Sequence, residues 1–135
     1  MLHLKMPQSI YNKLIKTAEK ESPLEACGLL AGNDLTIHAF YPLTNMDASA
    51  EHYSMDPAEQ FNALADMRKH GWEIVGIWHS HPETAARMSI EDQKLAFMPG
   101  VSYVILSLAA GHRGEIKSFR KNQDGSFVEE KIELS

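Results

Sequence analysis

Cysteine is almost absent from this chain, because Cys27 is the only one among 135 residues. A single cysteine excludes an intramolecular disulfide and any zinc site built from several cysteines. A zinc deaminase also requires a Pro-Cys-x-x-Cys segment downstream of its His-x-Glu residues, so the match of His81-Pro82-Glu83 to that signature fails. Thiol catalysis remains formally open, but the apolar neighbours of Cys27 favour a buried and unreactive thiol.

Long apolar runs are also lacking, since no stretch approaches the roughly 18 residues of a membrane span. The amino-terminal segment does not have the basic-then-apolar order of a signal peptide, which indicates a cytoplasmic protein. Thirteen Lys and Arg against eighteen Asp and Glu give a net charge of -5, and the basic residues do not cluster. We therefore expect neither a membrane nor a nucleic acid as a partner.

The composition is that of an ordinary globular protein, with 44% hydrophobic and 23% charged residues. Such a balance argues against disorder, collagen and a coiled coil. The length of the chain suits one hydrophobic core, so residues 1–135 are expected to form a single domain that carries the whole function.

Hydrophobic spacing predicts three helices and six strands. One helix is expected between Pro7 and Ser22, a second between Asp56 as its N-cap and Gly71, and a third from Ser89 to Met98. The extended segments are residues 26–31, 35–43, 72–81, 101–108, 115–121 and 127–134. The first two are expected to form a hairpin with its turn at Gly32-Asn33-Asp34. This order predicts an α/β (α+β) fold, in which helices flank a mixed β-sheet core.

The most informative motif is the pair His79 and His81 near the end of a predicted strand. Residues two apart on a strand point to the same face, so the two imidazoles can bind one ion. A catalytic zinc needs three protein ligands and one open position. The pair alone is weak evidence, because one histidine could be buried and the other exposed without any metal.

Two further polar groups complete a candidate site. Ser89 and Asp92 stand three residues apart at the expected start of a helix, where a capping box alone would explain them. The same helix start can also aim the hydroxyl and the carboxylate into a cleft, and Asp92 would then be the third ligand. Glu25 stands directly before an apolar strand and is the candidate general base, although acidic residues at strand edges are usually only solvated.

Taken together, these residues resemble the JAMM (MPN-plus) signature of zinc metalloproteases. The signature consists of Glu25 followed by Cys-Gly-Leu-Leu-x-Gly, then His79-x-His81-Pro, then Ser89-x-x-Asp92. The resemblance implies that His79, His81 and Asp92 bind Zn²⁺ and that a water completes the tetrahedron. It further implies that Glu25 deprotonates this water and that Ser89 stabilises the oxyanion by hydrogen bonding.

The resemblance also implies a fold and a substrate class. The expected fold is a single MPN-type catalytic domain over residues 1–135 with a cytidine-deaminase-like architecture. Family members remove ubiquitin or ubiquitin-like proteins, or process the tails of ubiquitin-like sulfur carriers. The short chain is similar to the compact prokaryotic members, so we expect hydrolysis after the C-terminal Gly-Gly of a ubiquitin-like sulfur-carrier protein. A non-catalytic MPN-type interaction module is the alternative, and the complete set of ligands and base favours the enzyme.

Overall fold

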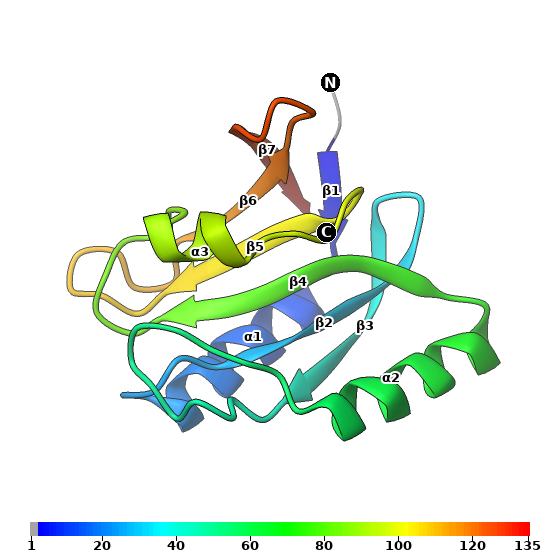
Figure 1. The fold of residues 1–135 in the computed structure, drawn as a ribbon, viewed down its shortest axis with the longest axis horizontal. Helices are drawn as coiled ribbons and strands as arrows, with labels where there is room; N and C mark the ends of the chain where they lie inside the picture. The colour runs from blue at the N-terminus through cyan, green and yellow to red at the C-terminus, as the bar shows by residue number, and fades with distance from the viewer. Residues whose placement is uncertain (1–2) are drawn as a thin grey trace.

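The computed structural model describes residues 3–135, in which a strongly curved sheet is flanked by helices (Figure 1). The helices are α1 (Gln8–Glu21), α2 (Pro57–His70) and α3 (Ile90–Leu95). The strands are β1 (His3–Met6), β2 (Cys27–Asn33), β3 (Thr36–Leu43), β4 (Glu73–His81), β5 (Ser102–Ser107), β6 (Ile116–Lys121) and β7 (Phe127–Leu134). The predicted class, a mixed sheet with flanking helices, is confirmed. No helix in the described range is both long and apolar enough to cross a membrane.

The sheet closes on itself through its first and last strands. Its spatial order is β1-β3-β2-β4-β5-β6-β7, and β1 runs parallel to both β3 and β7. In the middle, β2 is antiparallel to β4, whereas β4 and β5 run parallel. All residues of β5 and all but the last of β2 are buried, so the centre of the sheet lies within the core.

Two local predictions are corrected by the structure. Residues 3–6 were not expected to be extended, but Leu4 and Met6 alternate into the core and are fully buried, which makes β1 a strand. The hairpin between β2 and β3 is present, yet its turn is formed by Asp34 and Leu35, which have φ values of 48° and 64°. Gly32 and Asn33 belong to β2 instead, and position 32 requires glycine because a Cβ there would collide with the carbonyl group of Thr36.

The second helix follows its prediction and the third is shorter. In α2, the Asp56 side chain accepts a hydrogen bond from the Ala58 N–H at 2.8 Å, and Gly71 ends the helix with a φ of 72°. The third helix was expected to reach Met98 but ends at Leu95. The Tyr103 hydroxyl bonds both the N–H and the C=O of Met98, which removes that residue from a helical pattern.

Apolar side chains cover both faces of the central strands. On one face α1 packs into a cluster that contains Leu30 and Trp78. On the other face α2 packs into a cluster that contains Leu29. Because successive residues of a strand alternate between faces, the neighbours of Trp78 along β4 point away from α1. This places His79 and His81 on the face that α3 borders.

Candidate metal centre

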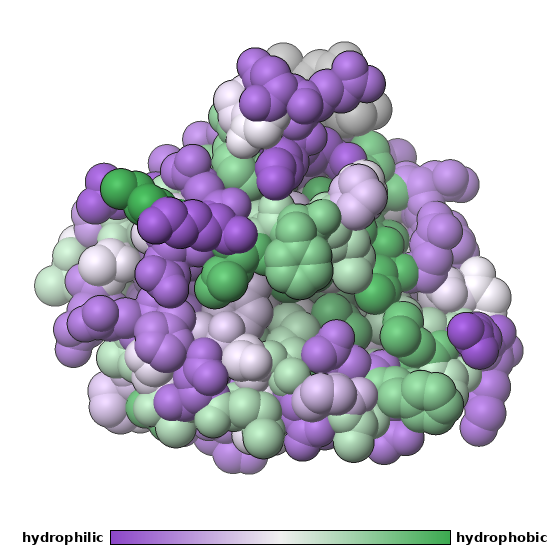
Figure 2. All heavy atoms as spheres, viewed as in Figure 1, coloured by the Kyte–Doolittle hydropathy of each residue, from purple (hydrophilic) through white to green (hydrophobic). Residues whose placement is uncertain are grey.

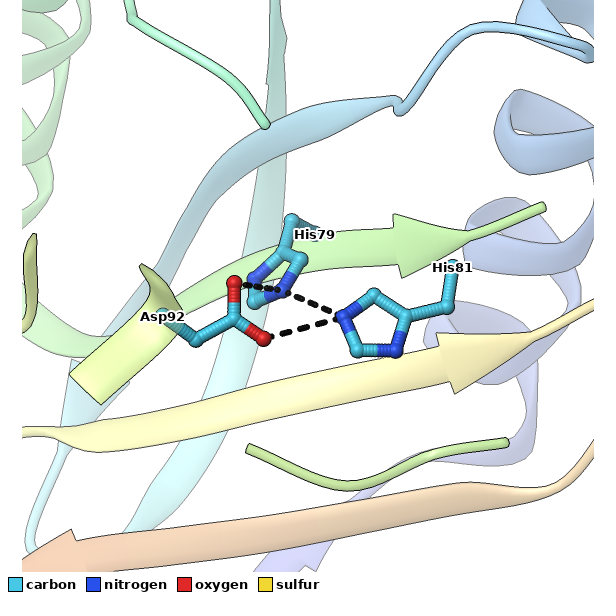
Figure 3. A group of neighbouring side chains, drawn as sticks. All are labelled: His79, His81 and Asp92. Carbon is cyan, nitrogen blue, oxygen red and sulfur yellow. Dashed lines mark hydrogen bonds and ion pairs between the residues drawn. The ribbon is translucent and has the colours of Figure 1, made fainter. Parts of the chain in front are cut away.

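The carboxyl end of β4 brings the two histidines of the motif together in the interior. His79 and His81 are only 2% and 4% exposed, and their Nε2 atoms lie 3.2 Å apart (Figure 3). Ser80 lies between them in the sequence and points the other way. Its Oγ accepts a hydrogen bond from the Ala26 N–H at 2.8 Å, which fixes β4 to the segment before β2.

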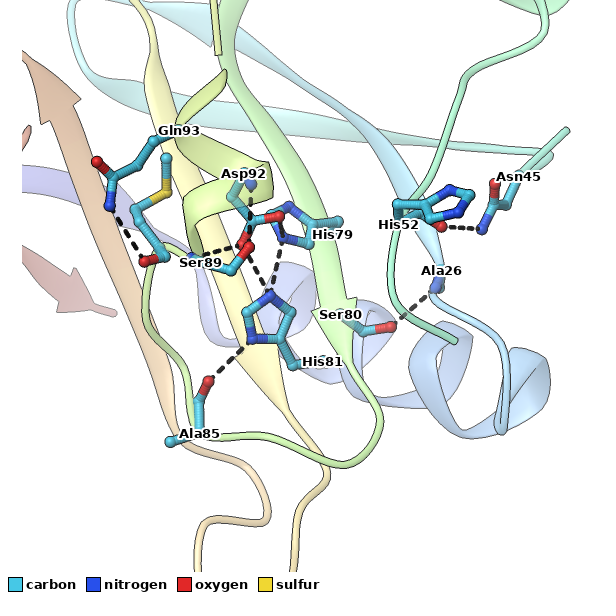
Figure 4. A network of polar contacts seen from close by, with 11 residues as sticks. Ala26, Asn45, His52, His79, Ser80, His81, Ala85, Ser89, Asp92 and Gln93 are labelled. Carbon is cyan, nitrogen blue, oxygen red and sulfur yellow. Dashed lines mark hydrogen bonds and ion pairs between the residues drawn. The ribbon is translucent and has the colours of Figure 1, made fainter. Parts of the chain in front are cut away.

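The carboxylate of Asp92 completes the group from the first turn of α3. Its Oδ1 lies 3.2 Å from His79 Nε2 and its Oδ2 lies 3.0 Å from His81 Nε2. The Ser89 Oγ accepts from the Asp92 N–H at 2.9 Å, and the Ser89 N–H donates to Asp92 Oδ2 at 3.0 Å. The predicted capping box is therefore present, and it points the carboxylate at both imidazoles (Figure 4).

The spacing of these three ligand atoms fits a small metal ion. Bonds of about 2.0 to 2.1 Å in a tetrahedron separate the ligand atoms by roughly 3.3 Å. The observed separations are 3.0 to 3.2 Å. Among residues 3–135 this is the one group of three or more such side chains whose ligand atoms converge. Two imidazoles and one carboxylate are also a donor set that zinc accepts, so the residues could hold this metal.

The protonation of His79 and Asp92 suits metal binding, whereas contacts with Asp92 and Ala85 outweigh burial and raise the pKa of His81. His81 Nδ1 lies 2.9 Å from the Ala85 carbonyl oxygen, which can only accept, so Nδ1 carries the hydrogen and Nε2 is left as a ligand atom. Burial lowers the pKa of His79 and favours its neutral form. Burial alone would raise the pKa of Asp92, but its close contacts with His79 and His81 and the hydrogen bond from the Ser89 N–H hold this pKa well below its usual range.

Glu25 lies in the loop before β2, where two hydrogen bonds fix its backbone and a third contact fixes the next residue. Its N–H donates to the Ser49 carbonyl oxygen at 2.7 Å, and its own carbonyl oxygen accepts from Asn45 Nδ2 at 3.0 Å. The third contact is the hydrogen bond between Ser80 and Ala26, which holds the next residue against β4. The position predicted for the base is thus fixed relative to the strand that carries both histidines.

The Glu25 carboxyl group is buried without a partner for one of its oxygens. The residue is 2% exposed, and Oε1 has no hydrogen-bond partner among the described residues. Burial raises the pKa of Glu25 to about 8, against the opposing charge of His81. A carboxyl group with a pKa near neutrality can accept and return a proton under ordinary conditions.

Two hollows lie beside the three candidate ligands. The acidic hollow, of about 350 Å³, is lined by Glu25, Glu51, Glu83, Glu91, His81 and Ser89 among others. The apolar hollow, of about 280 Å³, is lined by Tyr53, Met55, Ile77, Leu95, Phe97 and Met98 among others. Ile77, His79 and His81 follow one another on one face of β4. The apolar hollow therefore lies at the Ile77 end of this row, and the acidic hollow lies at the His81 end.

Three residues at this site were not found from the sequence. The Tyr53 ring stacks on His79 with centroids 4.8 Å apart, and it also lines the apolar hollow. Asn45 and Ser80 fix the segment that carries Glu25. Tyr53 and Asn45 lie between β3 and α2, a segment with a single bridge pair and no periodic pattern. Only Ser80 could have been found from the sequence, because it stands between the two histidines and strand alternation places it on the opposite face.

Cys27 is fully buried, and we expect its thiol to be unreactive in the folded protein. Burial, with a smaller contribution from Glu25, raises the pKa of Cys27 to about 12. Since the thiolate is the nucleophile, iodoacetamide at pH 8 should label native protein at least about 100-fold more slowly than urea-unfolded protein. Mass spectrometry of timed samples measures both rates. Equal rates would show that the thiol is accessible and would reopen thiol catalysis.

Comparison with known proteins relates nearly the whole chain to one family. Residues 7–122 match the family model described as prokaryotic homologs of the JAB domain. The CysO-cysteine peptidase of Mycobacterium tuberculosis is 35% identical over 127 residues, which are 93% of this chain and 86% of that protein. The desampylase of Haloferax volcanii is 35% identical over 102 residues, which are 73% of either chain.

Solved structures share the fold of this chain. A Desulfitobacterium hafniense protein, solved in solution, is 44% identical with a TM-score of 0.87 over 97% of this chain and 92% of its own. A JAB1/MPN domain protein of Archaeoglobus fulgidus has a TM-score of 0.64 at 19% identity, over 98% of this chain and 100% of its own. At that identity the second likeness concerns the fold alone, and it agrees with the predicted MPN-type architecture.

Proposed function

Because this chain belongs to the prokaryotic JAB-domain family, the compact JAMM/MPN type, we propose that it is a zinc-dependent hydrolase of peptide or isopeptide bonds. The family resemblance found in the sequence is confirmed by these relatives. The observation that carries the proposal is the convergence of His79, His81 and Asp92 beside a hollow lined by the buried, unpartnered Glu25. A non-catalytic interaction module gives no reason for burying such a carboxyl group, which costs stability.

In the proposed reaction a water adds to the carbonyl carbon, a C–O bond forms and the C–N bond breaks. Zinc held by His79, His81 and Asp92 would polarise the scissile carbonyl and make a water more acidic. Glu25 accepts one proton from the attacking water and returns it to the departing nitrogen. The Ser89 hydroxyl oxygen accepts the Asp92 N–H, and its hydrogen has no acceptor among residues 3–135, so Ser89 can donate this hydrogen and stabilise the developing oxyanion.

The apolar hollow is the proposed site for the tail of a ubiquitin-like sulfur-carrier protein. Phe97 and Leu95 at its edge are 80% and 45% exposed, and Phe61 on α2 is 71% exposed. Figure 2 shows apolar side chains gathered on this face between α3 and α2. An extended tail in the hollow leads to the candidate ligands past Tyr53, and the exposed apolar side chains are available to the folded body of the carrier.

A diglycine requirement tests this assignment. Two glycines before the scissile bond let the backbone approach the buried ligands, whereas a Cβ there meets the walls. We expect a carrier extended beyond Gly-Gly to be cut directly after the second glycine. Replacing either glycine by alanine should lower kcat/KM by about 100-fold or more, which corresponds to about 2.7 kcal/mol of lost transition-state stabilisation.

The measurement uses the zinc-loaded protein and mass spectrometry of the products. The matched control is an alanine substitution beyond the cut, which should leave kcat/KM within about twofold. Cuts scattered along the tail, or equal cutting of the glycine and alanine carriers, would contradict the assignment of the apolar hollow to a diglycine tail.

A further inference from the structure

We propose that the acidic hollow holds the leaving side of the substrate, and that it selects a lysine within a basic protein segment over an acidic segment or a single amino acid. This inference rests on the proposed hydrolase function and specifies its substrate class. Its basis is the juxtaposition of three exposed glutamates with the buried Glu25 around one hollow of about 350 Å³.

Glu25 determines which hollow receives the leaving amine. When the C–N bond breaks, the departing nitrogen must take up a proton, and Glu25 is the group that returns it. A proton donor has to lie within hydrogen-bonding distance of its acceptor, so the leaving nitrogen must lie beside Glu25. Glu25 lines the acidic hollow and does not line the apolar one. The row of residues on β4 then places the acyl tail at the Ile77 end and the amine at the His81 end.

The acidic hollow has a concentrated negative charge. Glu51 comes from the segment before α2, Glu83 from the loop after β4, and Glu91 from α3, and all three are exposed. None of them takes part in an ion pair among residues 3–135, and no lysine or arginine of this range lines the hollow. Their charges are therefore available to a bound partner, and a cleft lined by one sign of charge concentrates ions of the other sign.

This charge discriminates between possible leaving groups. A lysine side chain joined through its ε-nitrogen carries no charge at the amide, and its basic neighbours in the protein are attracted by the glutamates. A single amino acid released from the carrier keeps its α-carboxylate a few bonds from the scissile nitrogen. That carboxylate would lie among Glu51, Glu83 and Glu91, where like charges repel it. The hollow therefore favours removal of the carrier from a basic protein segment.

The test compares conjugates that share one carrier and differ only on the leaving side. The carrier is joined to the lysine of a basic peptide, to the lysine of an acidic peptide of equal length, or to a single alanine. With the zinc-loaded protein at 50 mM salt we expect kcat/KM for the basic conjugate to exceed the other two by about tenfold. The ratio should fall toward one at 0.5 M salt, because screening shortens the range of exposed charges.

Variants identify the residues responsible for the ratio. The triple variant Glu51→Gln, Glu83→Gln and Glu91→Gln should lower the ratio of kcat/KM between the basic and the other two conjugates to about twofold. The main cause should be a higher KM for the basic conjugate. The matched control neutralises three exposed glutamates that do not line the hollow, Glu73→Gln, Glu129→Gln and Glu133→Gln, and should keep the ratio of the native protein. Both variants change the net charge equally, so a general charge effect would alter both.

The outcomes separate this inference from the proposed function. If all conjugates are cut at equal rates, or if the triple variant keeps the ratio, the charge selection is wrong while the hydrolase function stands. If none is cut by zinc-loaded protein, the proposed function is wrong and the inference falls with it.

Discussion

Glu25→Gln should reduce turnover by about 1,000-fold while the fold and the metal affinity are retained. The amide has the same shape as the carboxyl group but cannot accept the proton of the attacking water, and positioned bases contribute about 100- to 10,000-fold. The loss should appear in kcat and kcat/KM together, because the interaction is made only in the transition state. Steady-state kinetics on a carrier conjugate and elemental analysis of bound zinc measure the two effects. Activity within about tenfold of the native protein would assign the base to another residue.

The stability of the metal-free protein provides a control for this variant. Above pH 4.5 the unfolded chain ionises Glu25, whereas the folded protein keeps it protonated up to a pKa of about 8. Between pH 4.5 and about 8 the folded state holds one more proton, on Glu25, than the unfolded state. The stability that this proton contributes is therefore lost as the pH rises. With a chelator present, the unfolding free energy of the native protein should fall by about 2 to 4 kcal/mol over this pH range. The unfolding free energy of Glu25→Gln should not show this fall. If the unfolding free energies of the two proteins changed in parallel with pH, burial would not be raising the pKa of Glu25.

Asp92→Asn should lower the affinity for zinc by at least about 100-fold and abolish turnover at limiting metal. Asparagine keeps the size of the side chain and an oxygen that can accept from the Ser89 N–H, so the cap of α3 is retained in part. It removes the negative charge that the two imidazoles share. Competition against a chromophoric chelator measures the affinity.

The matched control for this change is Ser89→Ala. It removes the hydroxyl cap, at a cost of about 1 kcal/mol, but leaves all three candidate ligand groups in place. We expect it to bind zinc within about tenfold of the native affinity and to lose turnover because the oxyanion donor is absent. Native zinc affinity in Asp92→Asn would remove this residue from the ligand set.

Much of the fold could be predicted because local signals and burial agree. The cap at Asp56 and the left-handed Gly71 bound α2 in both sequence and structure. The prediction failed where tertiary contacts decide the outcome. The end of α3 depends on a hydroxyl of Tyr103 on β5, and β1 exists only because strands from far along the chain pair with it. Neither partner can be inferred from residues nearby in the sequence.

The candidate site shows the same division. Strand periodicity was enough to place His79 and His81 on one face. The helix-start pattern alone would have allowed a simple capping box, and the resemblance to the JAMM signature was needed to name Asp92 as the third ligand. Tyr53 could not be predicted, since its position against His79 comes from the path of an irregular segment. The two hollows were also beyond prediction, because each combines residues from at least three separate segments.

The pairing of β1 with β7 has a consequence for how the chain folds during synthesis. His3 pairs with Lys131 and Met6 with Leu134, while β1 has only one pair with β3. Contacts this distant in sequence form late, because loop closure costs entropy before the contacts repay it. On the ribosome, β2, β4 and α3 emerge before β7 and can associate early. We therefore expect the candidate ligands to come together before the sheet closes, because closure needs the pairing of β1 with residues 131–134.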